Sequence, residues 1–237
     1  MLLLPFVIAP AAHAGHASTA RSHSGCAQRV ALAASRLAYV GVVRRSATAF
    51  RVPGRRPFAR FGRVNLNGAR TVFSLREALL DRGCRPTWYR VQLPVKPNGV
   101  TGWVPAASVQ VGTVTTRIVV DLSDRQLTFY RDGRALLRVP VGIGSRATPT
   151  PRGRFYVNQR VVPRDRTGPF GPAVLGVSAY SRVLTHWAQG GPIAVHGTNS
   201  PQSIGHAAST GCIRVRNSVM RRLFAATPAG TPVLIRS

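Results

Sequence analysis

Acidic side chains are scarce in this sequence of 237 residues, which holds 6 Asp and Glu against 33 Lys and Arg, a formal net charge of +27. Lysine is rarer still, because Lys96 is the only one and all other basic residues are arginine. This charge predicts attraction to a polyanion, although a solvated surface on a chain biased towards arginine would give the same count. The hydrophobic content of 44% is ordinary and excludes a disordered chain.

The sequence lacks the features of a nucleic-acid-binding protein despite its charge. The arginines are spread along the chain and form neither a basic helix nor a set of aromatic residues for stacking on bases. We therefore expect no nucleic acid as a partner, and keep an arginine-rich polyanion binder as an alternative.

Motifs for metals and cofactors are also missing. The chain has no C-x-x-C pair and no H-E-x-x-H sequence, which are common zinc-binding patterns. His13, His16 and His23 lie close together near the N-terminus, where solvated side chains are expected rather than ligands. We expect neither a metal nor a cofactor.

Long hydrophobic runs are absent beyond the N-terminus, so no transmembrane segment is expected. Residues 1–14 are apolar but too short to span a bilayer, and they end in Ala12-His13-Ala14, a small-x-small cleavage pattern. The usual basic start is missing. We expect a signal peptide at 1–14, a flexible tail or linker at 15–37 and an exported protein; a frayed hydrophobic N-terminus is the alternative.

Cysteine is limited to Cys26, Cys84 and Cys212. An odd number in an exported protein suggests one disulfide and one free thiol. Cys26 with Cys84 is the expected pair, which leaves Cys212 reactive. The alternative is that all three are reduced, because the sequence does not fix the distance that a disulfide needs.

Residues 38–110 are expected to form a small β domain, because short β-rich runs alternate with Gly, Pro and Asn. The runs lie at 39–43, 47–52, 71–75, 88–93 and 101–104, with a helix of one or two turns at 75–81. The segment from Trp88 to Val104, with Asn98-Gly99 as a tight-turn signal, resembles the closing hairpin of bacterial SH3-like domains. The resemblance implies a small β-barrel; a spacer packed on the next domain is the alternative.

Residues 114–237 are expected to form a second, mainly β domain after a junction at 111–116. Strands are predicted at 116–122, 126–130, 134–141, 155–162 and 231–235, with one more ending at His196. A helix is predicted at 218–226, with Asn217 as its N-cap and Val219, Leu223 and Ala226 on its inner face. The loop at 163–176 is long for a compact domain, which favours a functional role such as a lid.

The stretch 195–217 carries the candidate chemistry. Cys212 is a nucleophile only as thiolate, and His196 could take its proton. Gly211 lets the backbone approach a substrate, and the N–H groups of Gly211 and Cys212 could hold an oxyanion. On an extended strand Arg214 would share a face with Cys212 and could bind a substrate carboxylate. Ser209 completes this run of small polar residues.

Two segments of that stretch, His196-Gly197-Thr198 and Ser209-Thr210-Gly211-Cys212-Ile213-Arg214, resemble the active-site signature of the L,D-transpeptidases, the YkuD-like catalytic domain. The resemblance implies a β-sandwich with a short helix near the C-terminus. It further implies that the Gly197 carbonyl orients the histidine, and that Thr198, Ser209, Thr210, Arg214 and Gly153 (in the Thr150–Phe155 element) lie at the substrate. Many members have His where this chain has Thr210.

The resemblance implies acyl transfer on peptidoglycan. Cys212 would attack a tetrapeptide stem with His196 as the base, and an amine would resolve the thioester to give a 3–3 cross-link. The alternatives are an L,D-carboxypeptidase, in which water resolves it, and a non-catalytic cell-wall-binding protein. An anionic cell-wall polymer is a possible further partner for the basic surface, and the location would be the cell wall or extracellular face.

Overall fold

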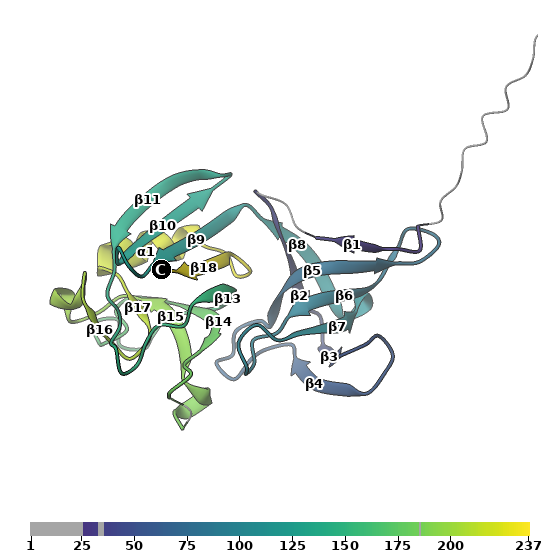
Figure 1. Ribbon diagram of the computed structural model, residues 1–237, viewed down its shortest axis with the longest axis horizontal. Helices are drawn as coiled ribbons and strands as arrows, with labels where there is room; N and C mark the ends of the chain where they lie inside the picture. Colours follow the sequence, from purple (N-terminus) through teal and green to yellow (C-terminus); the bar gives the residue numbers. More distant parts are fainter. Residues whose placement is uncertain (1–25, 33–35, 185) are drawn as a thin grey trace, which may run out of the picture.

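The computed structural model describes residues 26–32, 36–184 and 186–237. It has two mainly β lobes that lie side by side, an N-terminal domain and a C-terminal domain (Figure 1). The predicted mainly β fold is confirmed. The expected signal peptide, most of the expected tail and the three N-terminal histidines lie outside the described residues.

The N-terminal domain is one sheet with the strand order β4-β3-β7-β6-β5-β2-β8, and β1 pairs with β5 off this path. Its core contains Phe73, Leu75, Val91 and Leu93. The strands are β1 (Arg29–Ala31), β2 (Ala38–Val43), β3 (Ser46–Phe50), β4 (Pro57–Gly62), β5 (Val72–Leu80), β6 (Pro86–Gln92), β7 (Thr101–Pro105) and β8 (Val109–Val114), with a 3₁₀ turn at Ala106–Ser108.

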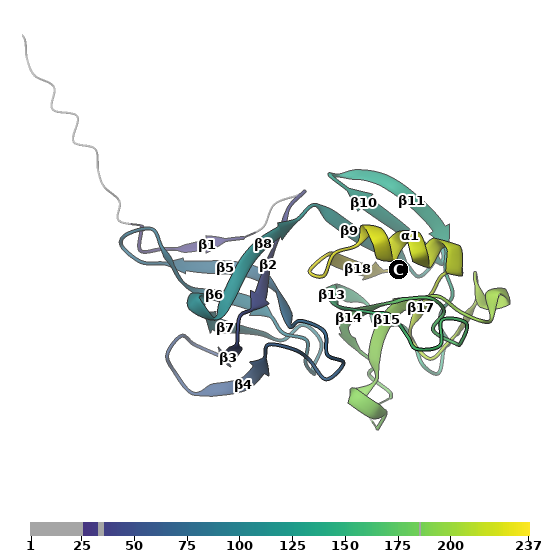
Figure 2. The same cartoon turned by 180° about the vertical axis from the view of Figure 1, so that it is seen from behind.

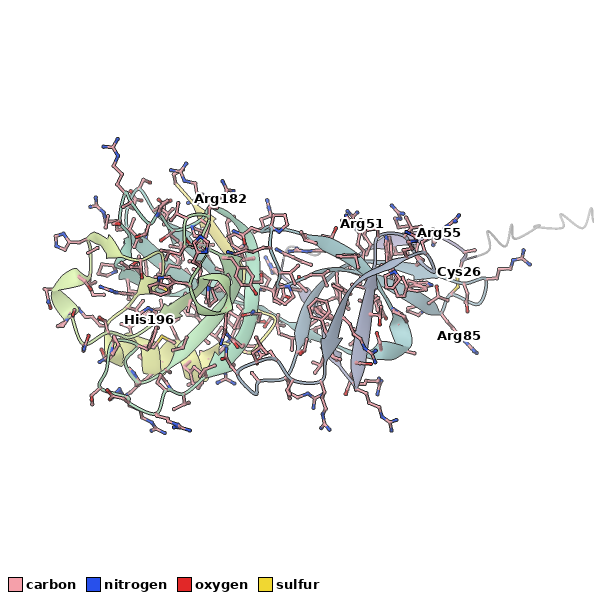
Figure 3. All side chains as sticks on the ribbon, turned by 90° about the horizontal axis from the view of Figure 1, so that it is seen from below. Cys26, Arg51, Arg55, Arg85, Arg182 and His196 are labelled. Atoms are coloured by element: carbon pink, nitrogen blue, oxygen red, sulfur yellow. A yellow bond between two sulfur atoms is a disulfide. The ribbon has the colours of Figure 1, made fainter. Side chains whose placement is uncertain are left out.

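Both ends of this domain extend beyond the predicted limits of 38–110. β1 lies inside the expected tail and pairs with β5, and Cys26 is joined to Cys84 by a disulfide, the pairing that the sequence favoured. At the other end β8 pairs with β2 as far as Val114, so the expected junction at 111–116 is mostly strand. Figure 3 shows Cys26 at the end of the molecule away from His196.

Two local predictions in the N-terminal domain are wrong. The helix expected at 75–81 is part of β5, because this strand has neighbours to pair with on both sides. Asn98 and Gly99 do not make a two-residue hairpin turn, since 93–100 separate β6 from β7. The Asn98 side chain instead hydrogen-bonds to the backbone N–H and carbonyl of Tyr180 in the C-terminal domain, each at 2.8 Å.

The C-terminal domain is a β-sandwich, in which one continuous sheet folds around a single hydrophobic core. The order is β11-β10-β9-β18-β13-β14-β15-β17, and the two halves enclose Ile118, Leu127, Leu175 and Val195 (Figure 1). The strands are β9 (Thr116–Asp121), β10 (Gln126–Arg131), β11 (Arg134–Pro140), β12 (Ile143–Gly144), β13 (Gly153–Val161), β14 (Val174–Tyr180), β15 (Pro192–His196), β16 (Ala207–Ser209), β17 (Ile213–Arg214) and β18 (Pro232–Arg236), with 3₁₀ turns at Ala188–Gly190 and Pro201–Ser203.

Helix α1 (Asn217–Ala226) lies across the face of this domain that Figure 2 shows, and it buries Met220 and Leu223 in the core. Its N-cap is Arg216, without a side-chain hydrogen bond, so the predicted Asn217 cap is wrong. The Asn217 amide oxygen instead accepts the Thr198 N–H at 2.8 Å. Within the described residues no helix is long and apolar enough to cross a membrane.

A fully buried tyrosine joins the two domains. Tyr156 of β13 reaches between them, and its hydroxyl lies 3.2 Å from the Val72 carbonyl and 3.1 Å from the Gln92 carbonyl. Val40 and Val72 complete an apolar cluster around its ring. Because buried carbonyls without a donor are costly, this hydroxyl ties β5 and β6 to the sheet of the C-terminal domain.

We expect Tyr156→Phe to lower the free energy of unfolding by about 1–3 kcal/mol, because it removes the one hydroxyl hydrogen that the two buried carbonyls share. Chemical denaturation measures the change. Tyr89→Phe is the matched control, since the buried Tyr89 side chain lies in the core of the N-terminal domain and not between the domains. Equal losses from the two variants would contradict a role for the Tyr156 hydroxyl.

Candidate active site

Two short parallel strands bring the candidate residues together. β15 pairs with β17 so that Val195 lies opposite Ile213 and His196 opposite Arg214. Side chains alternate along a strand, so Cys212 and Arg214 point to the same face as His196. The shared face follows from backbone pairing and so does not depend on long flexible side chains.

His196 is held in one orientation. Its Nδ1 lies 2.5 Å from the Gly197 carbonyl, its side chain is only 4% exposed, and the Phe170 ring packs edge-on at 5.1 Å. A carbonyl can only accept, so Nδ1 carries the proton and Nε2 keeps its lone pair. Burial lowers the pKa of His196 to about 4, and the charge of Arg214 adds to this effect against the opposing Gly197 hydrogen bond.

Cys212 is free and half-buried. Burial raises the pKa of its thiol, which a backbone hydrogen bond from Ala194 and the charge of Arg214 oppose. At pH 7 the thiol and the imidazole are therefore both neutral. The site holds a neutral acid and base, and not a preformed thiolate–imidazolium pair.

Arg214 is half-buried beside these two groups. Its backbone forms two hydrogen bonds with Gly142, which fix the strand. Its Nε is buried and has no hydrogen-bond partner among the described residues. A buried guanidinium N–H without a partner in a cleft suits an incoming carboxylate or carbonyl.

The turn before Cys212 is braced by hydroxyl groups. Ser209 Oγ donates to the Cys212 carbonyl at 2.6 Å and accepts the Gly211 N–H at 3.1 Å. The Gly211 N–H, expected as an oxyanion donor, is therefore occupied in this structure. Thr150 Oγ1 donates to the Gly211 carbonyl at 2.9 Å, and Thr148 Oγ1 donates to the Ser209 carbonyl at 3.0 Å.

A cleft of about 620 Å³ opens over this face. Its rim is apolar, with Phe170 from the expected lid loop 49% exposed and Trp187 55% exposed. The predicted residues that line it are His196, Ser209, Thr210, Cys212 and Arg214.

Four predicted residues lie outside the lining: Gly153, Gly197, Thr198 and Gly211. Gly153 begins β13 opposite Ile235, Thr198 is buried and bonded to Asn217, and Gly197 contributes its carbonyl. A Cβ on Gly197 would collide with the Asn217 amide oxygen and with Pro172, so this site needs glycine for close packing.

The N-terminal domain supplies one wall of the cleft through Asn67. Gln159 Oε1 accepts Asn65 Nδ2 at 2.7 Å and Asn67 Nδ2 at 3.0 Å, and Gln189 Nε2 donates to Asn67 Oδ1 at 3.0 Å. This contribution could not be predicted from the sequence, since it depends on how the domains pack. Thr148 and Thr150, which brace the cysteine turn, were visible only as part of a Gly-, Thr- and Pro-rich loop.

Comparison with known proteins places this site in a family. The model of the L,D-transpeptidase catalytic domain (YkuD) matches residues 115–235, half of the chain. The chain belongs to this family.

Relatives support this L,D-transpeptidase assignment. The protein named L,D-transpeptidase YkuD of Bacillus licheniformis is 39% identical over 124 residues, which cover 52% of this chain and 67% of the relative. The YkuD protein of Bacillus subtilis is 36% identical over 123 residues, with the same coverage. A crystal structure of the Enterococcus faecium L,D-transpeptidase is 28% identical with a TM-score of 0.40, covering 51% of this chain and 49% of that one. The chain thus matches about half the length of the solved protein.

We expect Thr150→Val in this L,D-transpeptidase domain to lower the free energy of unfolding by about 1–3 kcal/mol. The variant keeps the shape but leaves the buried Gly144 N–H without its acceptor and the Gly211 carbonyl without its donor. Denaturation measures the loss. Thr128→Val, at a half-buried site in β10, is the matched control and should change stability much less. An unchanged midpoint for Thr150→Val would contradict its bracing role.

Proposed function

We propose that the protein is an L,D-transpeptidase that uses Cys212 to form a thioester with a peptidoglycan stem peptide and passes the acyl group to an amine. The observation that carries the proposal is a neutral Cys212 thiol that lines the same cleft as a buried, neutral His196, whose Nε2 has no hydrogen-bond partner among the described residues, in a domain of this family. The roles of Cys212 as the nucleophile and of an amine as the acceptor are both part of this proposal.

In the first step His196 Nε2 takes the thiol proton while the Cys212 sulfur attacks the amide carbonyl of the stem. The tetrahedral intermediate collapses as the imidazolium returns that proton to the leaving amine, which departs as D-Ala. The low pKa of His196 makes its conjugate acid strong, which favours protonation of the leaving group.

The oxyanion would be held by backbone N–H groups of the cysteine turn. Cys212 N–H is the first candidate, and Gly211 N–H becomes the second if the substrate oxygen replaces Ser209 Oγ as its acceptor. Ser209 therefore has a bracing role in our proposal, beyond the substrate contact first expected.

Arg214 would bind the stem. Arg214 lines the cleft and its buried Nε has no partner among the described residues, so we propose that its guanidinium binds a carboxylate of the peptide. Thr210 is exposed on the cleft wall. Many family members have His at this position, so any contribution of a histidine side chain to the oxyanion pocket is absent here.

In the second step an amine attacks the thioester and loses a proton to His196, which restores the thiol and gives a 3–3 cross-link. Water in place of the amine would give carboxypeptidase activity.

We further propose that the N-terminal domain is an SH3-like module and that residues 1–14 direct export. The disulfide between Cys26 and Cys84 supports an oxidising compartment. The hairpin resemblance of residues 88–104 supports the first claim.

We expect a carbapenem-type β-lactam to add one drug mass to the folded protein and none to Cys212→Ser, measured by intact-mass spectrometry. Incubation with cell-wall sacculi followed by digestion should give 3–3 cross-linked dimers with the native protein only. Intact disulfide in the Cys212→Ser spectrum is the control for folding. Shortened monomers without dimers would indicate a carboxypeptidase. If neither the adduct nor the products form, the remaining alternative is a non-catalytic cell-wall-binding protein.

The acylation rate should be nearly constant from pH 7.5 down to 5.5 and fall to half at about pH 4, because His196 must be neutral to accept the proton. The sign follows from the lowered pKa, since protonation of this buried base begins only below the usual range of histidine. Single-turnover acylation by the β-lactam across the range, with circular dichroism at each pH to verify folding, measures this. Half-loss near pH 6.5 would contradict a buried neutral base.

A further inference from the structure

A second pocket lies at the junction of the two domains and shares no residue with the cleft. It has a volume of about 300 Å³ and is lined from both domains. Four of its lining residues are arginines, Arg36 and Arg76 from the N-terminal side and Arg117 and Arg154 from the C-terminal side. None of its lining residues is acidic.

These four guanidinium groups have no carboxylate partner in the part of the chain that the structure describes. The three ion pairs found there use Arg29, Arg90 and Arg236 with Glu77 or Asp121. Four positive charges that line one pocket without a counter-charge repel one another. An anion in the pocket would relieve this repulsion.

The central member is Arg76. It is half-buried and donates to the Gln92 amide oxygen, which fixes it at the base of the junction. Burial lowers the pKa of Arg76, and the nearby charge of Arg154 lowers it further. The two groups therefore feel each other across the domain boundary.

The other arginines are supported by ordinary packing that leaves their N–H groups available. Arg117 stacks on the Tyr130 ring with its central carbon 4.5 Å from the ring centre. The Arg36 side chain lies against Gly133 in the β10–β11 turn. Stacking on an aromatic face orients a guanidinium but satisfies none of its in-plane donors.

The geometry points to a binding site for a phosphate-bearing anion at the domain junction. Guanidinium forks match phosphate oxygens in pairs, and several arginines can share one phosphate group. The pocket is at the small end of ligand sites and leaves room for a sugar or polyol joined to the phosphate. A phosphodiester polymer and free phosphate are the two sources of this chemistry.

The competing explanation is uniform attraction of a chain with net charge +27 for any polyanion. Matched double variants separate the two. Arg117→Gln with Arg154→Gln removes two charges from the pocket, and both residues are exposed, so folding should be kept. Arg55→Gln with Arg85→Gln removes the same charge from the far end of the N-terminal domain, where Figure 3 labels both residues.

Titration calorimetry at constant ionic strength would use poly(glycerol phosphate), inorganic phosphate and polyglutamate. We expect saturable binding of a phosphate ligand, weakened roughly tenfold or more by the pocket variant and less than twofold by the control. Arg76→Gln alone should weaken it as well. If inorganic phosphate binds as tightly as each phosphate group of the polymer, the natural ligand is free phosphate. If only the polymer binds, the ligand is a phosphodiester.

Equal weakening by the two double variants, equal binding of polyglutamate, or no saturable binding would overturn the proposal. The circular dichroism spectrum and the melting temperature should stay unchanged in both double variants, which shows that the protein is folded. The inference does not rest on the proposed function, because a protein without transpeptidase activity could still bind phosphate here.

Discussion

The pairing of β15 with β17 is the constraint on which the rest of the site depends. Because His196 lies opposite Arg214, the base, the thiol and the arginine share one face without long side chains having to find one another. Both strands are short and buried in the core of the C-terminal domain, so their register is fixed by Val195 and Ile213, which are fully buried. A shift of one residue in β17 would turn Cys212 and Arg214 away from the face on which His196 lies.

Burial at this face has opposite effects on the two partners of the proposed proton transfer, Cys212 and His196. It raises the pKa of the Cys212 thiol and lowers the pKa of His196, so the resting site avoids two buried charges. Arg214 works against the imidazolium but in favour of the thiolate. In a cleft with an apolar rim, the ion pair would then form only as the substrate arrives, when the oxyanion donors and the leaving amine can share the charge.

The sequence was informative where function depends on local order and misleading where it depends on distant partners. The strand alternation from Cys212 to Arg214 and the Gly197 carbonyl beside His196 are local features, and both could be read from spacing or family resemblance. Asn217 and Asn98 matched local capping and turn patterns, but their partners lie 19 and 82 residues away. The helix expected at 75–81 failed for the same reason, since pairing with β6, β2 and β1 overrides a local preference.

The packing of the two domains argues that the N-terminal domain is part of the enzyme and not a tethered spacer. Tyr156 buries its hydroxyl against β5 and β6, the Asn98 side chain pairs with the Tyr180 backbone, and Asn67 reaches the cleft through Gln159. The Tyr156 and Asn98 contacts are buried or half-buried, so breaking either one leaves polar groups unsatisfied, whereas the Asn67 contact is exposed. The same packing brings arginines of both domains together at the second pocket. An anion bound in this pocket would contact both domains at the boundary that also positions Asn67. The proposed pocket thus gives part of the excess of arginine a specific binding role.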